Sequence, residues 1–216
     1  MSGITLYDYW RSSASYRVRL ALAVKGLEYR THPVNLLVGA HKAAPHLQRN
    51  PQAFVPVMEI EGVELTQSLA IIDYLEERFP TPALLPEDFL ERAQVRALAH
   101  ALAVDIHPVC NLSIVKEIAL LSDAGDEAKK AWMQRHIRRG LCAFEKLLER
   151  GKPGRFCFKD RIGLADIVLL PQIYNADRWS AERSDLPLIC GIVERLQQEE
   201  VLQAAAPREP LGTTTH

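Results

Sequence analysis

The sequence predicts an α/β domain followed by an all-α domain, and three observations indicate this order. Residues 3–79 mix short alternating runs, typical of strands, with amphipathic helical runs. The segment Phe79–Pro86 then holds three prolines in eight residues, which breaks any regular pattern. After it the chain has helical periodicity almost throughout. We therefore expect a domain boundary in this segment, between an N-terminal domain over residues 1–80 and a helical domain over residues 88–216.

The N-terminal domain is predicted to open with a strand, a turn and a helix. Thr5–Trp10 alternates and carries aromatic residues, as a half-buried strand does. Arg11–Ser13 supplies turn and N-cap chemistry, and Val18, Ala21 and Leu22 follow at helical spacing. A second strand is predicted over Tyr29–Asn35, where Pro33 favours an edge position.

The rest of this domain is predicted to hold a hairpin and a second helix. Residues 36–50 are irregular apart from one helical turn at 41–44. Val55-Pro56 leads into a strand, Glu61-Gly62 forms a turn, and a second strand runs over 63–65. Gln67-Ser68 then opens a helix whose apolar face is formed by Leu69, Ile72, Leu75 and Phe79.

Four helical regions are predicted after the boundary. A long amphipathic helix starts near Ala93 and should be interrupted by Pro108, which lacks a backbone donor. The others are a helix over Glu127–Glu149 ending at Gly151, an apolar central helix over Leu164–Ala176, and one or two short helices within Leu186–Leu202. Gly163 stands where the central helix should be capped, and glycine is only slightly worse than serine there.

Composition and charge exclude several classes of function. The 216 residues are 48% hydrophobic and 25% charged, with a net charge of −1 and no basic stripe for nucleic acid. No segment is apolar enough to cross a bilayer, so we expect no membrane partner and a cytoplasmic location. The four cysteines are scattered and the histidines lack ligand spacing, so we predict buried free thiols and no metal.

The start of the first helix is the leading candidate for a functional site. A serine hydroxyl placed among unpaired backbone N–H groups is suited to bind an anion or a thiolate. The simpler interpretation is an ordinary capped helix in which Arg17 and Arg19 are solvated charges. The second helix start at Gln67-Ser68, soon after Val55-Pro56, favours a thiol-binding site.

Three segments together resemble one known family: Arg-Ser-Ser-Ala-Ser-Tyr-Arg-Val-Arg at 11–19, Val55-Pro56, and Gln-Ser-Leu-Ala-Ile-Ile at 67–72. They are similar to the zeta-class glutathione transferases, which include the maleylacetoacetate and maleylpyruvate isomerases, and the likeness runs from about Ile4 to Ala206. The resemblance implies the glutathione transferase fold, with a thioredoxin-like N-terminal domain that binds glutathione and an all-helical C-terminal domain that binds substrate. It also implies glutathione as cofactor and a homodimer.

The resemblance further implies roles for residues of the N-terminal domain. Ser12 or Ser13 would stabilise the glutathione thiolate, and the sequence does not rank the two. Arg11 would add positive potential or hold a substrate carboxylate. The family commonly has Cys after the two serines, where this chain has Ala14, so thiol-linked inactivation at that position is not expected.

Glutathione itself would be held by two further segments. Val55 would pair its backbone with the cysteinyl part, and the Val55–Pro56 bond would be cis. Gln67 and Ser68 would hold the γ-glutamyl carboxylate at a helix N-terminus.

In the helical domain the resemblance points to His107, Asn111 and Arg178. His107 and Asn111 match residues that reach glutathione in members similar to maleylpyruvate isomerase, although a histidine beside proline is more often structural. Ser113 stands where maleylpyruvate isomerases can carry Arg, which favours maleylacetoacetate. Arg178 matches an arginine that binds a substrate carboxylate; the simpler interpretation is a surface arginine paired with Asp177 or Glu182.

The resemblance therefore implies a glutathione-dependent cis–trans isomerase of an unsaturated keto dicarboxylic acid, with maleylacetoacetate as the favoured small anionic substrate. Maleylpyruvate isomerisation, and conjugation or dehalogenation of small substrates, are alternatives on the same scaffold. A non-catalytic binding module is the alternative from another class.

Overall fold

The computed structural model describes residues 3–209 as two compact units. The N-terminal unit comprises residues 3–84 together with residues 200–209, and the helical unit comprises residues 85–199. The division falls inside the proline-rich segment. Residues 200–209, which we expected in the helical domain, pack with the N-terminal unit instead: α9 (Glu200–Gln203) contacts α1, and Arg19 Nε donates to the Ala205 carbonyl at 3.1 Å.

The N-terminal unit is built on a four-stranded mixed sheet. Its strands are β1 (Ile4–Asp8), β2 (Tyr29–Pro33), β3 (Val57–Ile60) and β4 (Val63–Thr66), in the order β2-β1-β3-β4. β1 pairs in parallel with β2 and antiparallel with β3, and β3 pairs antiparallel with β4. Pro33 thus lies on an edge strand, as expected. Glu61 and Gly62, both with positive φ, form the two-residue turn between β3 and β4.

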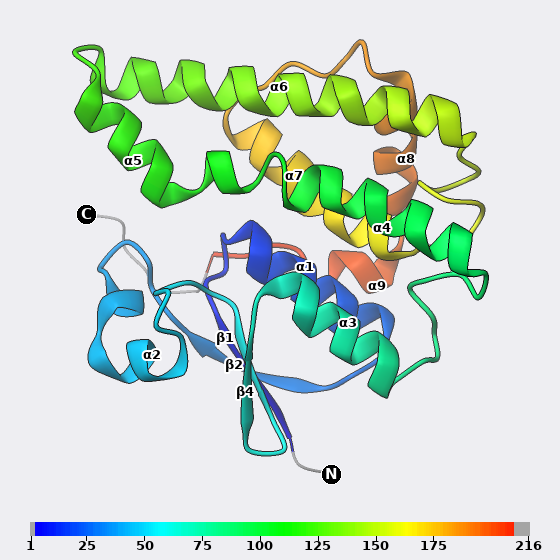
Figure 1. Ribbon diagram of the computed structural model, residues 1–216, viewed down its shortest axis with the longest axis horizontal. Helices are drawn as coiled ribbons and strands as arrows, with labels where there is room; N and C mark the ends of the chain where they lie inside the picture. The colour runs from blue at the N-terminus through cyan, green and yellow to red at the C-terminus, as the bar shows by residue number, and fades with distance from the viewer. Residues whose placement is uncertain (1–2, 210–216) are drawn as a thin grey trace. The chain divides into compact units, whose positions relative to one another are not determined.

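Two helices, α1 (Ser13–Val24) and α3 (Ser68–Arg78), pack against each other beside this sheet (Figure 1). Their inward faces are fully buried, including Val18, Leu20 and Leu22 on α1 and Ile71 and Leu75 on α3. The element order βαβαββα confirms the predicted thioredoxin-like domain.

The structure differs from the prediction at the end of β1 and in the segment after β2. β1 ends at Asp8 rather than Trp10, because the Tyr9 carbonyl already accepts the Ser12 N–H at 2.8 Å in the following turn. The segment after β2 contains η1 (Ala40–Lys42) and a helix α2 (Ala44–Arg49) where we expected one turn. Pro45 in the first turn of α2 fits a helix start.

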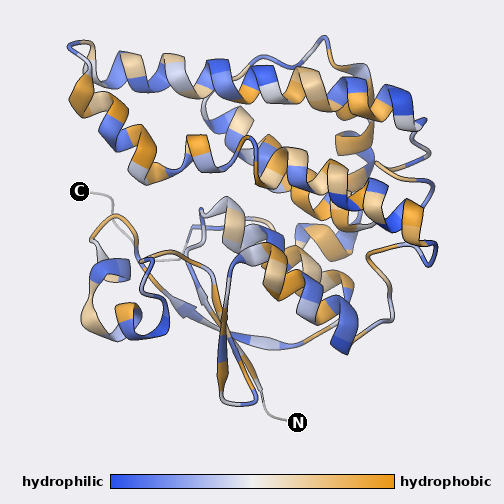
Figure 2. Cartoon of the chain, viewed as in Figure 1, coloured by the Kyte–Doolittle hydropathy of each residue, from blue (hydrophilic) through white to orange (hydrophobic). Residues whose placement is uncertain are grey.

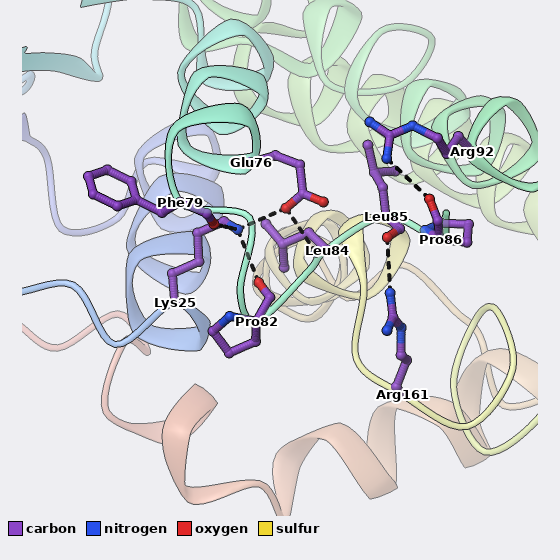
Figure 3. A network of polar contacts seen from close by, with 9 residues as sticks. All are labelled: Lys25, Glu76, Phe79, Pro82, Leu84, Leu85, Pro86, Arg92 and Arg161. Atoms are coloured by element: carbon purple, nitrogen blue, oxygen red, sulfur yellow. Dashed lines mark hydrogen bonds and ion pairs between the residues drawn. The ribbon is translucent and has the colours of Figure 1, made fainter. Parts of the chain in front are cut away.

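A buried ion pair fixes the end of this unit. Lys25 Nζ lies 2.8 Å from Glu76 Oε2 and also donates to the Phe79 and Pro82 carbonyls, while Glu76 Oε2 accepts the Leu84 N–H (Figure 3). The Lys25 side chain has no exposed surface. The pair therefore anchors the chain from Phe79 to Leu84 to its own unit.

The helical unit contains six helices in the described chain: α4 (Phe89–Ala103), the short 3-10 helix η2 (Pro108–Cys110), α5 (Leu112–Leu121), α6 (Gly125–Gly151), α7 (Leu164–Arg178) and α8 (Pro187–Gln197). The carbonyls of Leu85 and Pro86 are held by Arg161 and Arg92 at its start (Figure 3). The predicted interruption occurs, but α4 ends at Ala103, and Pro108 begins η2 instead of breaking a continuous helix.

The central helix α7 is buried along nearly its whole length, as predicted, although Pro171 lies inside it. Gly163 is its N-cap, and the Asp166 carboxylate accepts the Gly163 N–H at 2.9 Å. The helix therefore starts without a serine or threonine cap.

Hydropathy distinguishes two other helices of this unit. α6 alternates polar and apolar residues, whereas α5 is largely apolar (Figure 2). Leu120 and Leu121, at the end of α5, are strongly exposed. Within residues 3–209 no single helix is long and apolar enough to span a membrane. The pair Phe89–Cys110 and Leu112–Leu121, bent by 40°, meets that test only jointly and by length and composition.

Candidate functional site

Ser12 is the N-cap of α1. It has extended backbone angles, and its Oγ accepts the Ser15 N–H at 3.3 Å. A hydroxyl that accepts a bond in this way keeps its own hydrogen to donate. Ser13 is the first residue of the helix and is buried, whereas Ser12 is half-buried. Of the two predicted thiolate partners, Ser12 therefore has the better exposed hydroxyl at the capping position.

Arg11 precedes the cap and lies against aromatic rings. Its guanidinium carbon is 5.4 Å from the centre of the Trp10 ring and 5.9 Å from that of Tyr9. It forms no ion pair with any described residue, so none of the described carboxylates neutralises its charge. Stacking of this kind orients the guanidinium while leaving its planar donors for an anion.

Val55 lies before β3, and its bond to Pro56 is cis, as expected. Val55 packs in a small core with Tyr7, Tyr9 and Val57. Within residues 3–209 neither its backbone N–H nor its carbonyl makes a hydrogen bond. The side chain is therefore fixed while the backbone retains one donor and one acceptor, the pair that an extended peptide ligand requires.

Gln67 and Ser68 form the start of α3. Gln67 has φ +67° and ψ 111°, a conformation that L-residues rarely adopt, and its side chain bonds to Gln52 instead of capping the helix. Strained positions of this kind concentrate at ligand-binding sites. Ser68 is buried at the first helical position. The first-turn N–H groups of α3 thus lack a side-chain cap and could bind a carboxylate.

The hydrogen bond between Arg17 and Ser68 brings the two helix starts together. Arg17 Nη1 donates to Ser68 Oγ at 3.2 Å, so the fifth residue of α1 contacts the first residue of α3. Arg17 is 3% exposed and Arg19 is 7% exposed. The interpretation of both as solvated charges is therefore wrong.

Sequence analysis missed Arg17 as a site residue. The available signal was its helical spacing, since a residue one position before Val18 and four before Ala21 lies near the apolar stripe of α1. A charged side chain on that stripe needs a partner or a ligand, and this requirement marks Arg17 as a candidate site residue.

His107 and Asn111 flank η2 in the helical unit. The Asn111 side chain caps α5, since its Oδ1 accepts the Ser113 N–H at 3.1 Å and the Ser113 hydroxyl at 3.2 Å. Its amide nitrogen keeps its hydrogens for another acceptor. Trp132 Nε1 donates to the Val109 carbonyl at 2.9 Å and holds η2 against α6. His107 is half-buried.

Arg178 is the last residue of α7 and is exposed, with its guanidinium carbon 5.9 Å from the centre of the Tyr174 ring. Asp177, one of the two partners in our simpler interpretation, is bonded to Arg183 at 3.0 Å. Glu182, the other partner considered, accepts the backbone N–H groups of Arg183 and Ser184. The expected role of Arg178 toward a substrate carboxylate stays a prediction.

Neither a reactive thiol at Cys110 nor a metal-binding cluster is found among the described residues. Cys110 is buried, and burial raises the pKa of its thiol to about 12, so it is inert near neutral pH. The four cysteines are free. Within the described part of the chain, no group of three or more His, Cys, Asp or Glu is arranged to hold a metal ion.

The chain is similar to glutathione transferases and maleylacetoacetate isomerases in its sequence. Residues 2–77 match the family described as glutathione S-transferase, N-terminal domain. The chain is 50% identical to maleylacetoacetate isomerase of Rhizobium meliloti (strain 1021), over 94% of this chain and 95% of that one.

Two solved structures are similar over nearly their full lengths. One is the holo structure of maleylpyruvate isomerase, a bacterial zeta-class glutathione S-transferase, with a TM-score of 0.93, 37% identity, and coverage of 97% and 100% of the two chains. The other is maleylacetoacetate isomerase from Anaeromyxobacter dehalogenans 2CP-1 with glutathione in its active site, with a TM-score of 0.85, 39% identity, and coverage of 99% and 100%. A second structure of that enzyme holds dicarboxyethyl glutathione and citrate.

Proposed function

We propose that this chain, which belongs to the maleylacetoacetate isomerase family of zeta-class glutathione transferases, catalyses the glutathione-dependent isomerisation of maleylacetoacetate to fumarylacetoacetate. The observation that carries the proposal is its 50% identity to an isomerase of which it covers 95%. The glutathione complex of the Anaeromyxobacter relative supports glutathione as the cofactor. The dicarboxylate adduct and citrate in that same enzyme support a substrate with two carboxylates.

The residues of the N-terminal unit fit glutathione chemically. The Val55 backbone offers a donor and an acceptor, and the uncapped start of α3 offers N–H groups for a carboxylate. Bound glutathione would supply a thiolate whose addition turns the conjugated double bond into a single bond that can rotate, and whose departure after rotation restores the double bond in the trans acid. Ser12 donates its hydroxyl hydrogen to the sulfur and thereby favours the charged form.

Arg11 and Arg178 bind the substrate carboxylates in this proposal. A guanidinium can hold a carboxylate with two parallel hydrogen bonds. The positive charge also stabilises negative charge that develops on the substrate in the transition state, and this stabilisation lowers the reaction barrier. His107 and Asn111 bind glutathione, with Asn111 donating from the amide nitrogen that capping does not use.

The first test is turnover of maleylacetoacetate followed by absorbance, with and without glutathione. Turnover that requires glutathione supports the proposal. Glutathione binding without turnover of maleylacetoacetate would exclude this reaction and leave maleylpyruvate isomerisation, or conjugation or dehalogenation of small substrates. Failure to bind glutathione would support the alternative function of a non-catalytic binding module.

Maleylpyruvate is the second candidate substrate, favoured by the TM-score of 0.93 to maleylpyruvate isomerase and by His107. Ser113 opposes it, because members acting on maleylpyruvate can carry Arg at that position. The two acids should be compared in parallel, and we expect maleylacetoacetate to react faster. Ser113→Arg should then raise the relative rate on maleylpyruvate.

Two further expectations concern assembly and location. We expect a homodimer, which light scattering at working concentration tests, with a monomeric mass as the contrary result. We also expect a cytoplasmic location, which fractionation of the source cells tests.

A further inference from the structure

The α1 segment carries three buried cations, and Arg17 differs from the other two. Arg19 lies 2.8 Å from the Asp8 carboxylate and also donates to the Trp10 and Ala205 carbonyls. Lys25, just after the helix, pairs with Glu76. Among residues 3–209, Arg17 has no carboxylate partner, and its one hydrogen bond goes to the Ser68 hydroxyl.

The Arg17 guanidinium is also incompletely satisfied. Its Nε is buried and has no hydrogen-bond partner among the described residues. Burial lowers the pKa of Arg17 to about 10, so the side chain remains charged at neutral pH. A buried, charged and partly unpaired group is costly, and such groups normally have a counter-charge. Since residues 3–209 supply no counter-charge, a bound anion could provide it.

The direction of the Arg17–Ser68 bond shows where that anion would lie. Ser68 Oγ accepts from Arg17 Nη1 and keeps its own hydrogen to donate. Ser68 is the first residue of α3, whose N-cap Gln67 is held at φ +67° and gives no side-chain cap. A carboxylate at this helix start would receive the Ser68 hydroxyl and face the charge of Arg17 behind it.

We propose that Arg17 is a positioning residue that supplies, through the Ser68 hydroxyl, the positive charge that selects the γ-glutamyl α-carboxylate of glutathione. This inference rests on the proposed use of glutathione and goes beyond it, because it names a residue that does not touch the ligand. Arg17 therefore contributes to the affinity for the γ-glutamyl α-carboxylate, and not to the affinity for the rest of glutathione.

The alternative is that Arg17 only holds α1 against α3. The two roles are separated by comparing two ligands: glutathione, and 4-aminobutanoyl-cysteinylglycine, which lacks only the α-carboxylate of the γ-glutamyl group. Binding is measured calorimetrically on the full chain without substrate. The control variant is Arg30→Met, which removes an exposed arginine of the same unit.

The wild-type protein should bind glutathione about 10- to 100-fold more tightly than the analogue. Arg17→Met should lose most of that ratio by weakening glutathione alone, Arg17→Lys should recover part of it, and Arg30→Met should leave it unchanged. Equal weakening of both ligands, or an unchanged ratio, would overturn the proposal.

Ser68→Ala provides the second test, including the case in which Arg17→Met does not fold. If Arg17 acts through this hydroxyl, Ser68→Ala should lower the same ratio, and an unchanged ratio would overturn the proposal. Wild-type protein that binds no glutathione would overturn the proposed function together with this inference. Binding without isomerase turnover would overturn only the proposed reaction, because the ratio remains measurable.

Discussion

Asp166→Asn tests how a buried carboxylate holds the central helix of the helical unit. Asp166 is 1% exposed; its Oδ1 accepts the Cys157 N–H and its Oδ2 accepts the Gly163 N–H, both at 2.9 Å. Asparagine keeps one acceptor and places an NH₂ group against the other backbone donor. Leaving that N–H unpaired should cost about 1–3 kcal/mol at pH 7.5.

The pH dependence of this cost can be worked out from the pKa. Burial raises the pKa of Asp166 from 3.8 to about 6, partly opposed by the two backbone N–H donors. At about 1.4 kcal/mol for each tenfold change in proton affinity, proton binding to Asp166 stabilises the folded state by about 3 kcal/mol. Because the folded pKa is raised, this stabilisation is fully present below pH 3.8 and is lost as pH rises through 6. At pH 4.5 about 2 kcal/mol of it remains.

Asparagine does not titrate, so the variant lacks this contribution. We expect its deficit in the free energy of unfolding to grow from about 1–3 kcal/mol at pH 7.5 to about 3–5 kcal/mol at pH 4.5. Urea unfolding at both pH values measures it. Asp160→Asn, which alters an exposed carboxylate that accepts the Arg155 N–H, is the matched control. A deficit that stays constant or shrinks as pH falls would refute the reasoning.

Three further predictions concern the ion pair, the cap and the thiols. Lys25→Met should lower the free energy of unfolding by about 3–5 kcal/mol in urea, because it removes the ammonium that faces the buried Glu76 carboxylate. Lys129→Met, at an exposed pair, should cost under about 1 kcal/mol. Ser12→Ala should cost about 1 kcal/mol of stability through the lost cap. It should also lower kcat by about 100-fold or more, whereas a kcat near that of wild type would exclude Ser12 as thiolate partner. Mass-spectrometric labelling at pH 8 should modify Cys142 before Cys110, and the reverse order would contradict the burial argument.

Local sequence patterns predicted most of the elements. Alternation in β1, the Glu61-Gly62 turn and the apolar spacing of α3 depend on neighbours within a few residues, so the sequence contains their causes. The helix α2 was missed because its residues form no clear apolar stripe. The assignment of residues 200–209 to the helical domain failed for a related reason, since their contact to Arg19 joins positions far apart in the chain.

By itself, the sequence determined the order of the two domains, the proline-rich boundary, and the candidate residues at the starts of α1 and α3, because capping and periodicity are local properties. Only the tertiary structure decided that Arg17 and Arg19 are buried, and that Arg19 is neutralised by Asp8 while Arg17 reaches Ser68. The physical reason is that the cost of a buried charge depends on what surrounds it in space. Spacing along a helix can place an arginine near the core, but folding of distant segments decides whether it has a counter-charge.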